Sequence, residues 1–233
     1  MKKVVLSSLF ALLFITTLAN AATLFYGGDL DLNDPNQNGL ANENDAIVGG
    51  SPYGAATYQN FIIKDPDWDI TGLWTNNLST NTPVNGYWEI RSGVSEGNGG
   101  VLIASGTTSI TNTPTGRSDF GYTEYTNKVT FPSIDLNSGQ YWFAVVPACP
   151  TCAGRTFNSD TDGLNSVGSQ TSGQQYFNSA FFGANFTNAN NEGVFNIFSS
   201  GVEGTITPEP SSLIMLGSGL VGVAGVVRRR LSR

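Results

Sequence analysis

Between residues 22 and 207, no 3.6-residue hydrophobic period lasts long enough for a good helix. Instead, short stretches with strand character are separated by turn clusters rich in Gly, Asn, Ser and Thr. Residues 86–91 and residues 125–131 alternate between apolar and polar side chains, as in half-buried strands. Residues 141–146 are continuously apolar, as in a strand covered on both faces. The pattern predicts an all-β protein.

Four further stretches have strand character, and they are residues 57–64, 101–105, 180–186 and 194–199. Many short strands at this spacing predict an antiparallel two-sheet β-sandwich of jelly-roll type. The region has the length of one domain. No internal repeat of fixed period is visible in it, which argues against a solenoid or a propeller.

The first 21 residues have the three parts of a secretory signal peptide. Two lysines give a positive start, and an uncharged, mostly apolar run follows over residues 4–18. This run is shorter than the roughly 20 residues that a membrane span needs. Small residues, Ala19 and Ala21, stand at the two positions that a signal peptidase reads. We expect a signal helix that the export machinery recognises and signal peptidase removes after Ala21.

The C-terminus carries a second uncharged run, over residues 211–227. At a rise of about 1.5 Å per residue it covers roughly 25 Å, the thin limit of a bilayer core. Its glycines are common in membrane helices, and the arginines that follow it favour the cytoplasmic side. The sequence predicts a transmembrane helix over residues 211–227 with the preceding domain outside. The arginines nearest to the run are Arg228, Arg229 and Arg230.

The order of three features at this end is similar to a known sorting signal. Pro208, Glu209 and Pro210 precede the apolar run, and the arginine cluster ends the chain. Residues 208–233 therefore resemble the PEP-CTERM sorting signal of Gram-negative bacteria. The resemblance implies that exosortase, a membrane-embedded transpeptidase-like enzyme, cuts near Pro-Glu-Pro and releases or transfers the rest. A plain tail anchor is the alternative, but it would not need the Pro-Glu-Pro.

The rest of the chain also resembles known proteins as a whole. Stretches that begin at Leu24, Gly86 and Gly139 are similar to other PEP-CTERM surface proteins whose role is not established. The implied location is a transient inner-membrane anchor, followed by the cell surface or the extracellular matrix. This type of tail also carries an ice-binding label. Ice binding would need a flat, regularly spaced threonine-rich face, and no such spacing is visible in the sequence.

The chain thus divides into a signal peptide (residues 1–21), an exported domain (residues 22–207, here the body) and a sorting signal (residues 208–233). Removal of both ends leaves five basic and 17 acidic residues, a net charge of −12. Such a surface repels nucleic acid, so we expect no nucleic-acid partner. The chain has no histidine, which excludes Ser-His-Asp and Cys-His catalysis and a His-ligated zinc site.

An Asn- and Asp-rich segment near the start of the body has the spacing of an EF-hand-like calcium loop. Alternate oxygen-bearing side chains would converge on one ion, while Gly39 allows a sharp turn. Against this, Pro35 occupies the second position and no helix is evident on either side. A surface turn is the alternative, because Asn, Asp and Gly also favour turns. The candidate calcium ligands are Asp34, Asn36, Asn38, Asn42 and Asp45.

Cys149 and Cys152 stand two residues apart, without the second pair or the βαβ context that a metal or redox site would have. In an oxidising compartment we expect a local disulfide, with free or intermolecular thiols as the alternative. Because the loop is short, it should stabilise the fold by less than the usual 2–4 kcal/mol.

Aromatic and acidic residues suggest two further sites. Trp68 lies within an acidic turn over residues 65–69 and Trp74 follows it, and both are candidates for an exposed sugar-binding platform. Trp88 and Trp142, in contrast, belong to strand-like runs. The carboxylates of the turn could form the pair that a glycosidase uses, but a solvated turn is the simpler interpretation.

These observations lead to three hypotheses of function. The first is a non-enzymatic structural or adhesive protein of the cell surface or extracellular matrix. The second is a carbohydrate-binding module that recognises extracellular polysaccharide, with calcium as its one conceivable cofactor. The third is a carboxylate-based glycoside hydrolase, which needs two carboxylates facing each other in a cleft.

Overall fold

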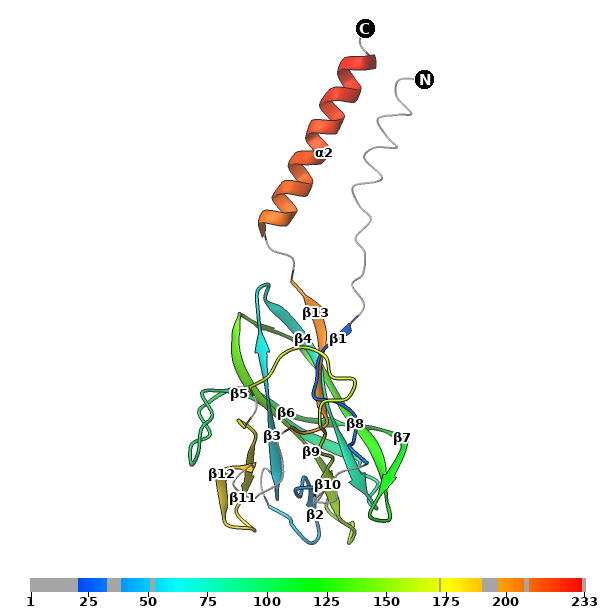
Figure 1. The fold of residues 1–233 in the computed structure, drawn as a ribbon, viewed down its shortest axis with the longest axis vertical. Coiled ribbons are helices and arrows are strands. Elements are labelled where there is room, and N and C mark those ends of the chain that lie inside the picture. The colour runs from blue at the N-terminus through cyan, green and yellow to red at the C-terminus, as the bar shows by residue number, and fades with distance from the viewer. Residues whose placement is uncertain are drawn as a thin grey trace.

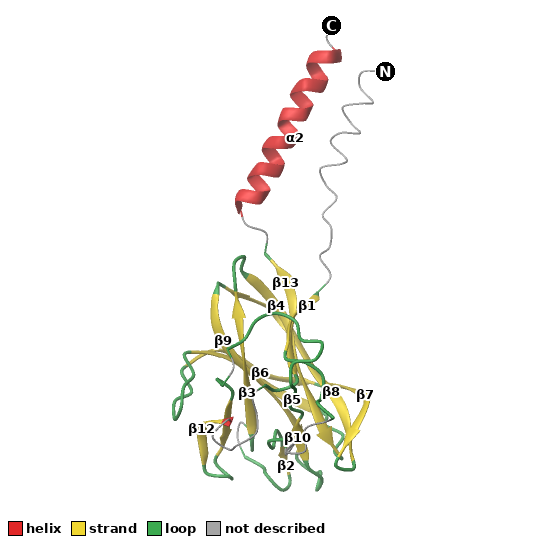
Figure 2. Ribbon diagram, viewed as in Figure 1, coloured by secondary structure: helices red, strands yellow, loops and turns green. Residues whose placement is uncertain are grey.

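The structure is a computed structural model that describes residues 21–32, 39–50, 53–171, 173–189, 197–207 and 210–231, apart from the side chains of residues 210–216 and 221. The described residues form two β-sheets and one long C-terminal helix (Figures 1 and 2). The predicted signal helix over residues 1–21 lies outside the described part, except for Ala21.

The first sheet has six strands, in the order β1-β13-β4-β8-β7, with β10 paired to β4. All its pairings are antiparallel. Its strands are β1 (Ala22–Tyr26), β4 (Trp68–Ser79), β7 (Thr111–Asp119), β8 (Tyr122–Leu136), β10 (Thr156–Asn158) and β13 (Ser200–Ile206).

The second sheet has seven strands, in the order β12-β11-β3-β9-β5-β6, with β2 paired to β9. Its pairings are antiparallel except for the short parallel contact of β2 with β9. Its strands are β2 (Asn44–Asp45), β3 (Ala56–Ile63), β5 (Asn85–Ser92), β6 (Val101–Ser109), β9 (Gly139–Cys149), β11 (Tyr176–Ser179) and β12 (Ala184–Asn188). The prediction of an all-β sandwich of two mainly antiparallel sheets is confirmed.

The main hydrophobic core lies between the two sheets. Leu73 and Val129 contribute to it from the first sheet, and Phe61, Ile90 and Phe143 from the second. All five side chains are at most 1% exposed. Because alternate strand residues point to opposite faces, one face of each sheet supplies this core.

A second core covers the outer face of the seven-stranded sheet. Trp142, Ala144 and Val146 of β9 pack there with Tyr58 of β3 and with Phe186 of β12. Strand β9 is therefore buried on both faces, as its continuous apolar run predicted. Both cores consist of body residues, so the body contains its own hydrophobic interior.

Two of the predicted strands differ from the structure. The stretch 180–186 forms a turn first, and β12 begins only at Ala184. Residues 194–196 of the stretch 194–199 lie outside the described part, Phe198 forms an isolated bridge with Asp160, and β13 begins at Ser200. In both cases turn or loop backbone directly precedes the strand in the described residues.

Helix α2 (Pro210–Leu231) follows β13 and includes the predicted transmembrane range 211–227. It stands away from the sandwich (Figure 1). In the part of the chain that the structure describes, no helix is long and apolar enough to cross a membrane. The side chains of residues 210–216, which begin the predicted span, lie outside that part.

Candidate functional site

Most of the predicted processing residues lie at or beyond the limits of the described chain. Ala19, Pro208 and Glu209 are outside it, while Ala21 is exposed directly before β1. Pro210 begins α2. The three predicted arginines are exposed in the last turn of α2, where positive charge is favourable beside the helix C-terminus.

The predicted calcium ligands are divided between the described and undescribed parts of the chain. Asp34, Asn36 and Asn38 lie outside the described residues. Asn42 is buried, and it donates to Val145 O (2.8 Å) and accepts from the Thr57 N–H (3.3 Å). Within the described chain, no group of three His, Cys, Asp or Glu residues could hold a metal ion. The calcium site stays a prediction.

Asp45, the last predicted calcium ligand, is also hydrogen-bonded within the protein. Its Oδ1 accepts from the backbone N–H groups of Ile47 (2.8 Å) and Val48 (3.0 Å), and its Oδ2 accepts from Asn81 Nδ2 (3.1 Å). Asp45 is 3% exposed. These contacts shape the turn that follows β2, so the side chain has a structural role in this conformation.

The two tryptophans proposed as a sugar-binding platform are part of the packing. Trp68 is 8% exposed and stacks on Phe61, with ring centroids 5.9 Å apart. Trp74 is half-buried against Tyr26 and covers Gly201, where an added Cβ would lie 2.1 Å from the indole. The prediction of an exposed platform at Trp68 is wrong, because β4 begins at this residue and turns its side chain into the core. Trp88 and Trp142 are buried, as expected.

The acidic turn beside Trp68 links neighbouring segments. Asp67 Oδ1 accepts from the Ser138 N–H (3.0 Å). Asp69 accepts from Ser133 Oγ (3.3 Å) and from Thr207 Oγ1 (3.2 Å). These contacts join the start of β4 to the end of β8 and to the end of the body, which favours the structural interpretation of the turn.

Cys149 and Cys152 form a disulfide, with Cα atoms 5.3 Å apart. The Cys152 N–H donates to Cys149 O (2.8 Å), and Cys152 O accepts from the Ala46 N–H (3.0 Å). The loop thereby fixes the segment after β2 to the end of β9.

Three buried glutamates are paired with arginines, and none of them was predicted as a site from the sequence. Glu43, Glu89 and Glu124 are at most 1% exposed, which is rare for an acid unless it is paired. Their arginine partners are Arg155, Arg91 and Arg117, respectively. Glu89 and Arg91 stand two residues apart on β5, hence on one face of the strand, and that spacing could have revealed their pairing.

The Glu89 carboxylate is fully enclosed on the outer face of the second sheet. Its Oε1 accepts from Tyr58 Oη (2.5 Å) and Arg91 Nε (2.6 Å), and its Oε2 accepts from Tyr87 Oη (2.8 Å). Burial, followed by the hydrogen bond to Glu89, raises the pKa of Tyr87. Arg91 also lies over the ring of Phe186, at 5.4 Å. The cluster links β3, β5 and β12.

Arg117 joins two carboxylates at the edge of the first sheet. Its Nε lies 2.5 Å from Glu124 Oε2, and its Nη1 lies 2.8 Å from Asp29 Oδ1. Asp29 also accepts from Tyr26 Oη (2.7 Å) and from Asn165 Nδ2 (2.7 Å). Although partial burial opposes it, these hydrogen bonds and the Arg117 charge lower the pKa of Asp29. The cluster connects β7 and β8 to the segment after β1.

The third pair combines Glu43 with Arg155. Glu43 Oε1 accepts from Arg155 Nε (2.7 Å), and Oε2 accepts from the Thr156 N–H (2.6 Å). Burial raises the pKa of Glu43 to about 7, and a hydrogen bond with Asp45 adds to the rise. The contacts from Arg155 and Thr156 oppose it. The guanidinium also lies 4.9 Å above the ring centroid of Phe157.

We expect Glu43→Gln to change how stability depends on pH. The folded protein holds the proton of the Glu43 carboxyl group more tightly than the unfolded chain does. Protonated Glu43 therefore stabilises the fold fully below the ordinary pKa of 4.5, and this stabilisation is lost as pH rises through about 7. The free energy of unfolding of the unchanged body, minus that of Glu43→Gln, should fall by roughly 3 kcal/mol between about pH 4 and pH 8. Urea unfolding at a series of pH values measures it, and a constant difference would contradict the assignment.

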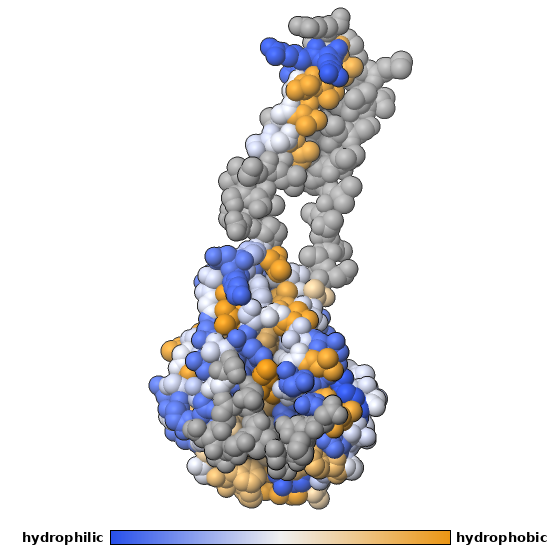
Figure 3. Space-filling model, viewed as in Figure 1, coloured by the Kyte–Doolittle hydropathy of each residue, from blue (hydrophilic) through white to orange (hydrophobic). Residues whose placement is uncertain are grey.

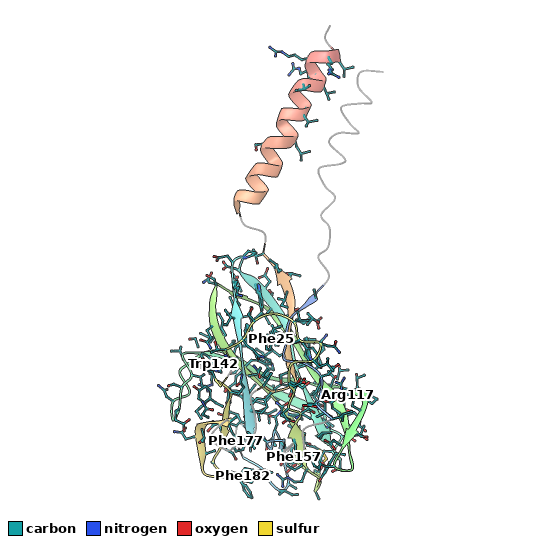
Figure 4. The ribbon with its side chains drawn as sticks, viewed as in Figure 1. Phe25, Arg117, Trp142, Phe157, Phe177 and Phe182 are labelled. Atoms are coloured by element: carbon teal, nitrogen blue, oxygen red, sulfur yellow. A yellow bond between two sulfur atoms is a disulfide. The ribbon has the colours of Figure 1, made fainter. Side chains whose placement is uncertain are left out.

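A pocket of about 380 Å³ lies beside the third pair. Phe157, Phe177 and Phe182 line it and lie close together at the end of the sandwich opposite α2 (Figure 4). Phe177 is buried, whereas Phe182 is 47% exposed, with ring centroids 6.0 Å apart. Figure 3 shows a pale orange apolar area at this end. The other lining residues are Gly39, Leu40, Ala41, Arg155 and Ala184.

The pocket differs from the sites that the sequence suggested. It offers aromatic faces and one guanidinium, with the volume of a small ligand site. Arg155 is already paired with Glu43, whose carboxylate is enclosed. The arrangement can bind a partly apolar ring by stacking, and it presents no pair of carboxylates to a ligand among its lining residues.

Comparison with known proteins identifies the C-terminal segment. Residues 207–230 match the PEP-CTERM protein-sorting motif. No curated protein matches the chain. The motif indicates export, a membrane-anchored sorting signal and processing by exosortase-type machinery, in agreement with the resemblance of residues 208–233.

Proposed function

From the premise that this chain is a PEP-CTERM protein and therefore an exosortase substrate, we propose that its body is a non-enzymatic structural component of the cell surface or extracellular matrix. Signal peptidase removes the N-terminal segment, and exosortase acts at the C-terminal motif. The body then joins the extracellular polymer layer.

One observation carries this proposal: the body uses its few cations internally. Four of its five basic side chains form ion pairs with acidic residues, and three of those acids are buried. The fifth, Lys64, is exposed. These pairs connect strands and loops within the sandwich. Apart from Lys64, the cationic groups that could act on a ligand therefore serve the fold, and the remaining surface is acidic.

A strain that lacks the chain tests the structural role. We expect it to shed more polysaccharide into the medium than the parent strain, and expression of the full chain should restore retention. Equal shedding by both strains would contradict a structural contribution to the polymer layer.

The aromatic pocket favours a second candidate function, a carbohydrate-binding module. Aromatic faces stack on sugar rings, and Phe182 is the exposed ring of the pocket. For this function we expect saturable polysaccharide binding by the body, weakened at least about tenfold by Phe182→Ala.

The neighbouring Phe181 supplies the matched control for this variant. It is 59% exposed and contacts Phe182 edge-on, with ring centroids 4.9 Å apart, but it is not among the lining residues. Phe181→Ala should therefore leave binding unchanged. If the two variants lose polysaccharide affinity equally, the pocket is not the binding site.

A further inference from the structure

Strand β6 forms one edge of the seven-stranded sheet. It pairs with β5 and with no other strand in the described chain. One row of its backbone N–H and C=O groups therefore faces away from the sheet, ready to pair with another strand. Residues 101–103 add an apolar surface, because Val101, Leu102 and Ile103 are 64%, 46% and 42% exposed.

The edge at β6 has one of the features by which proteins usually protect such strands, a single shift in register, and lacks the others. Short length, charged side chains, prolines and bulges all discourage edge pairing. The edge of the first sheet at β7 has Pro114 and an irregular register between Pro114 and Ser118. Strand β6 has nine residues with neither proline nor charge, although its register also shifts once, at its pairing with Ile90 and Arg91.

The charge distribution indicates which strand can pair there. The body has a net charge of −12, yet residues 97–116 contain no charged side chain. Two copies of the body can therefore bring this segment together without placing carboxylates opposite each other, which would be destabilising. Antiparallel pairing of a strand with its own copy also satisfies two-fold symmetry, the commonest form of self-assembly.

We propose that β6 is a self-association edge, at which a second copy of this chain adds its own β6 and extends the seven-stranded sheet. Main-chain hydrogen bonds supply the pairing, as in other cases of strand addition. The inference goes beyond the proposed structural function, since a matrix protein can act without self-association.

Sedimentation velocity of the body over a range of concentrations tests this edge. We expect a reversible dimer or larger species, and Val101→Glu with Ile103→Glu should weaken association at least about tenfold. Leu164→Glu is the control, because Leu164 is 62% exposed and lies outside β6. A body that stays monomeric, or a β6 variant that associates like the control, would overturn the proposal.

Hydrogen exchange of the unchanged body keeps the test decisive if the glutamate variant folds poorly. Amide protection within residues 101–109 should rise with protein concentration, while protection of residues 111–119, the β7 edge of the first sheet, should not. If the protection of residues 101–109 does not change with protein concentration, self-association through β6 is contradicted. A monomeric body that gains this protection only with an unrelated extended peptide would assign the edge to a foreign strand instead. Neither result bears on polysaccharide retention, so the structural function stands or falls separately.

Discussion

Replacement of Arg117 by Met is expected to lower the free energy of unfolding of the body by about 3–5 kcal/mol, the range found when one partner of a buried ion pair is removed. Glu124 is fully buried, and its Oε2 accepts from Arg117 Nε and from Thr115 Oγ1. Its Oε1 has no hydrogen-bond partner in the described structure. Without Arg117, a buried carboxylate would retain a single side-chain donor, and Asp29 would lose a cation as well.

Lys128→Met is the matched control for this prediction. Lys128 pairs with Glu203 between β8 and β13, but their side chains are 32% and 23% exposed. Because solvent screens such a pair, we expect a loss of no more than about 1 kcal/mol. Urea unfolding measures both variants, and Glu124→Gln in the Arg117→Met background should recover part of the loss. Equal losses in the two single variants would contradict the role assigned to Arg117.

Replacement of Pro208 and Pro210 together by Ala should hold the uncut chain in the inner membrane. The resemblance to the PEP-CTERM signal implies a cut near these two prolines, which restrict the backbone, and alanine at both positions removes that restriction. The expected change is from a released or transferred body to a retained one. Cell fractionation and the intact mass of the body measure the outcome.

Ser211→Ala with Ser212→Ala is a suitable control, because these residues adjoin the Pro-Glu-Pro without belonging to it. Sorting should proceed normally in this variant. If the proline variant is released unchanged in a strain that has the sorting enzyme, residues 208–210 are not the processing signal.

The sequence predicted the fold wherever hydrophobic alternation was strong. The stretch 86–91 lies within β5, 125–131 within β8 and 141–146 within β9. Strands β1, β4 and β11 were not predicted, and neither were β7 and β13, which are rich in Thr, Ser and Gly and bury few large side chains. Sheet order depends on contacts between residues distant in sequence, which periodicity alone does not encode.

The side-chain environments were harder to predict than the strands. Residues 87 and 89 alternate away from the main core, yet a second core covers their face, so Glu89 is buried where solvent was expected. Trp68 stands in an acidic turn by sequence, but the start of β4 directs it inward. Composition did not reveal the aromatic pocket either, because Phe157, Phe177 and Phe182 come from separate segments.

The residues of the predicted calcium motif are of types that occur both in hydrogen-bonded turns and in calcium-binding loops. Asn42 and Asp45 have the residue types of oxygen ligands, and the structure uses their oxygens to accept hydrogen bonds from backbone and side-chain N–H groups. Calcium binding and turn formation both favour short side chains with oxygen acceptors. Spacing therefore could not separate a metal loop from a hydrogen-bonded turn.

Binding of the body, residues 22–207, to a panel of extracellular polysaccharides tests the central claim most directly. The structural account predicts no saturable binding and no release of sugar, in calcium and in chelator alike, because a structural component can retain the polymer layer without a defined polysaccharide site. Saturable binding that Phe182→Ala abolishes and Phe181→Ala preserves would contradict it, and would establish the body as a carbohydrate-binding module.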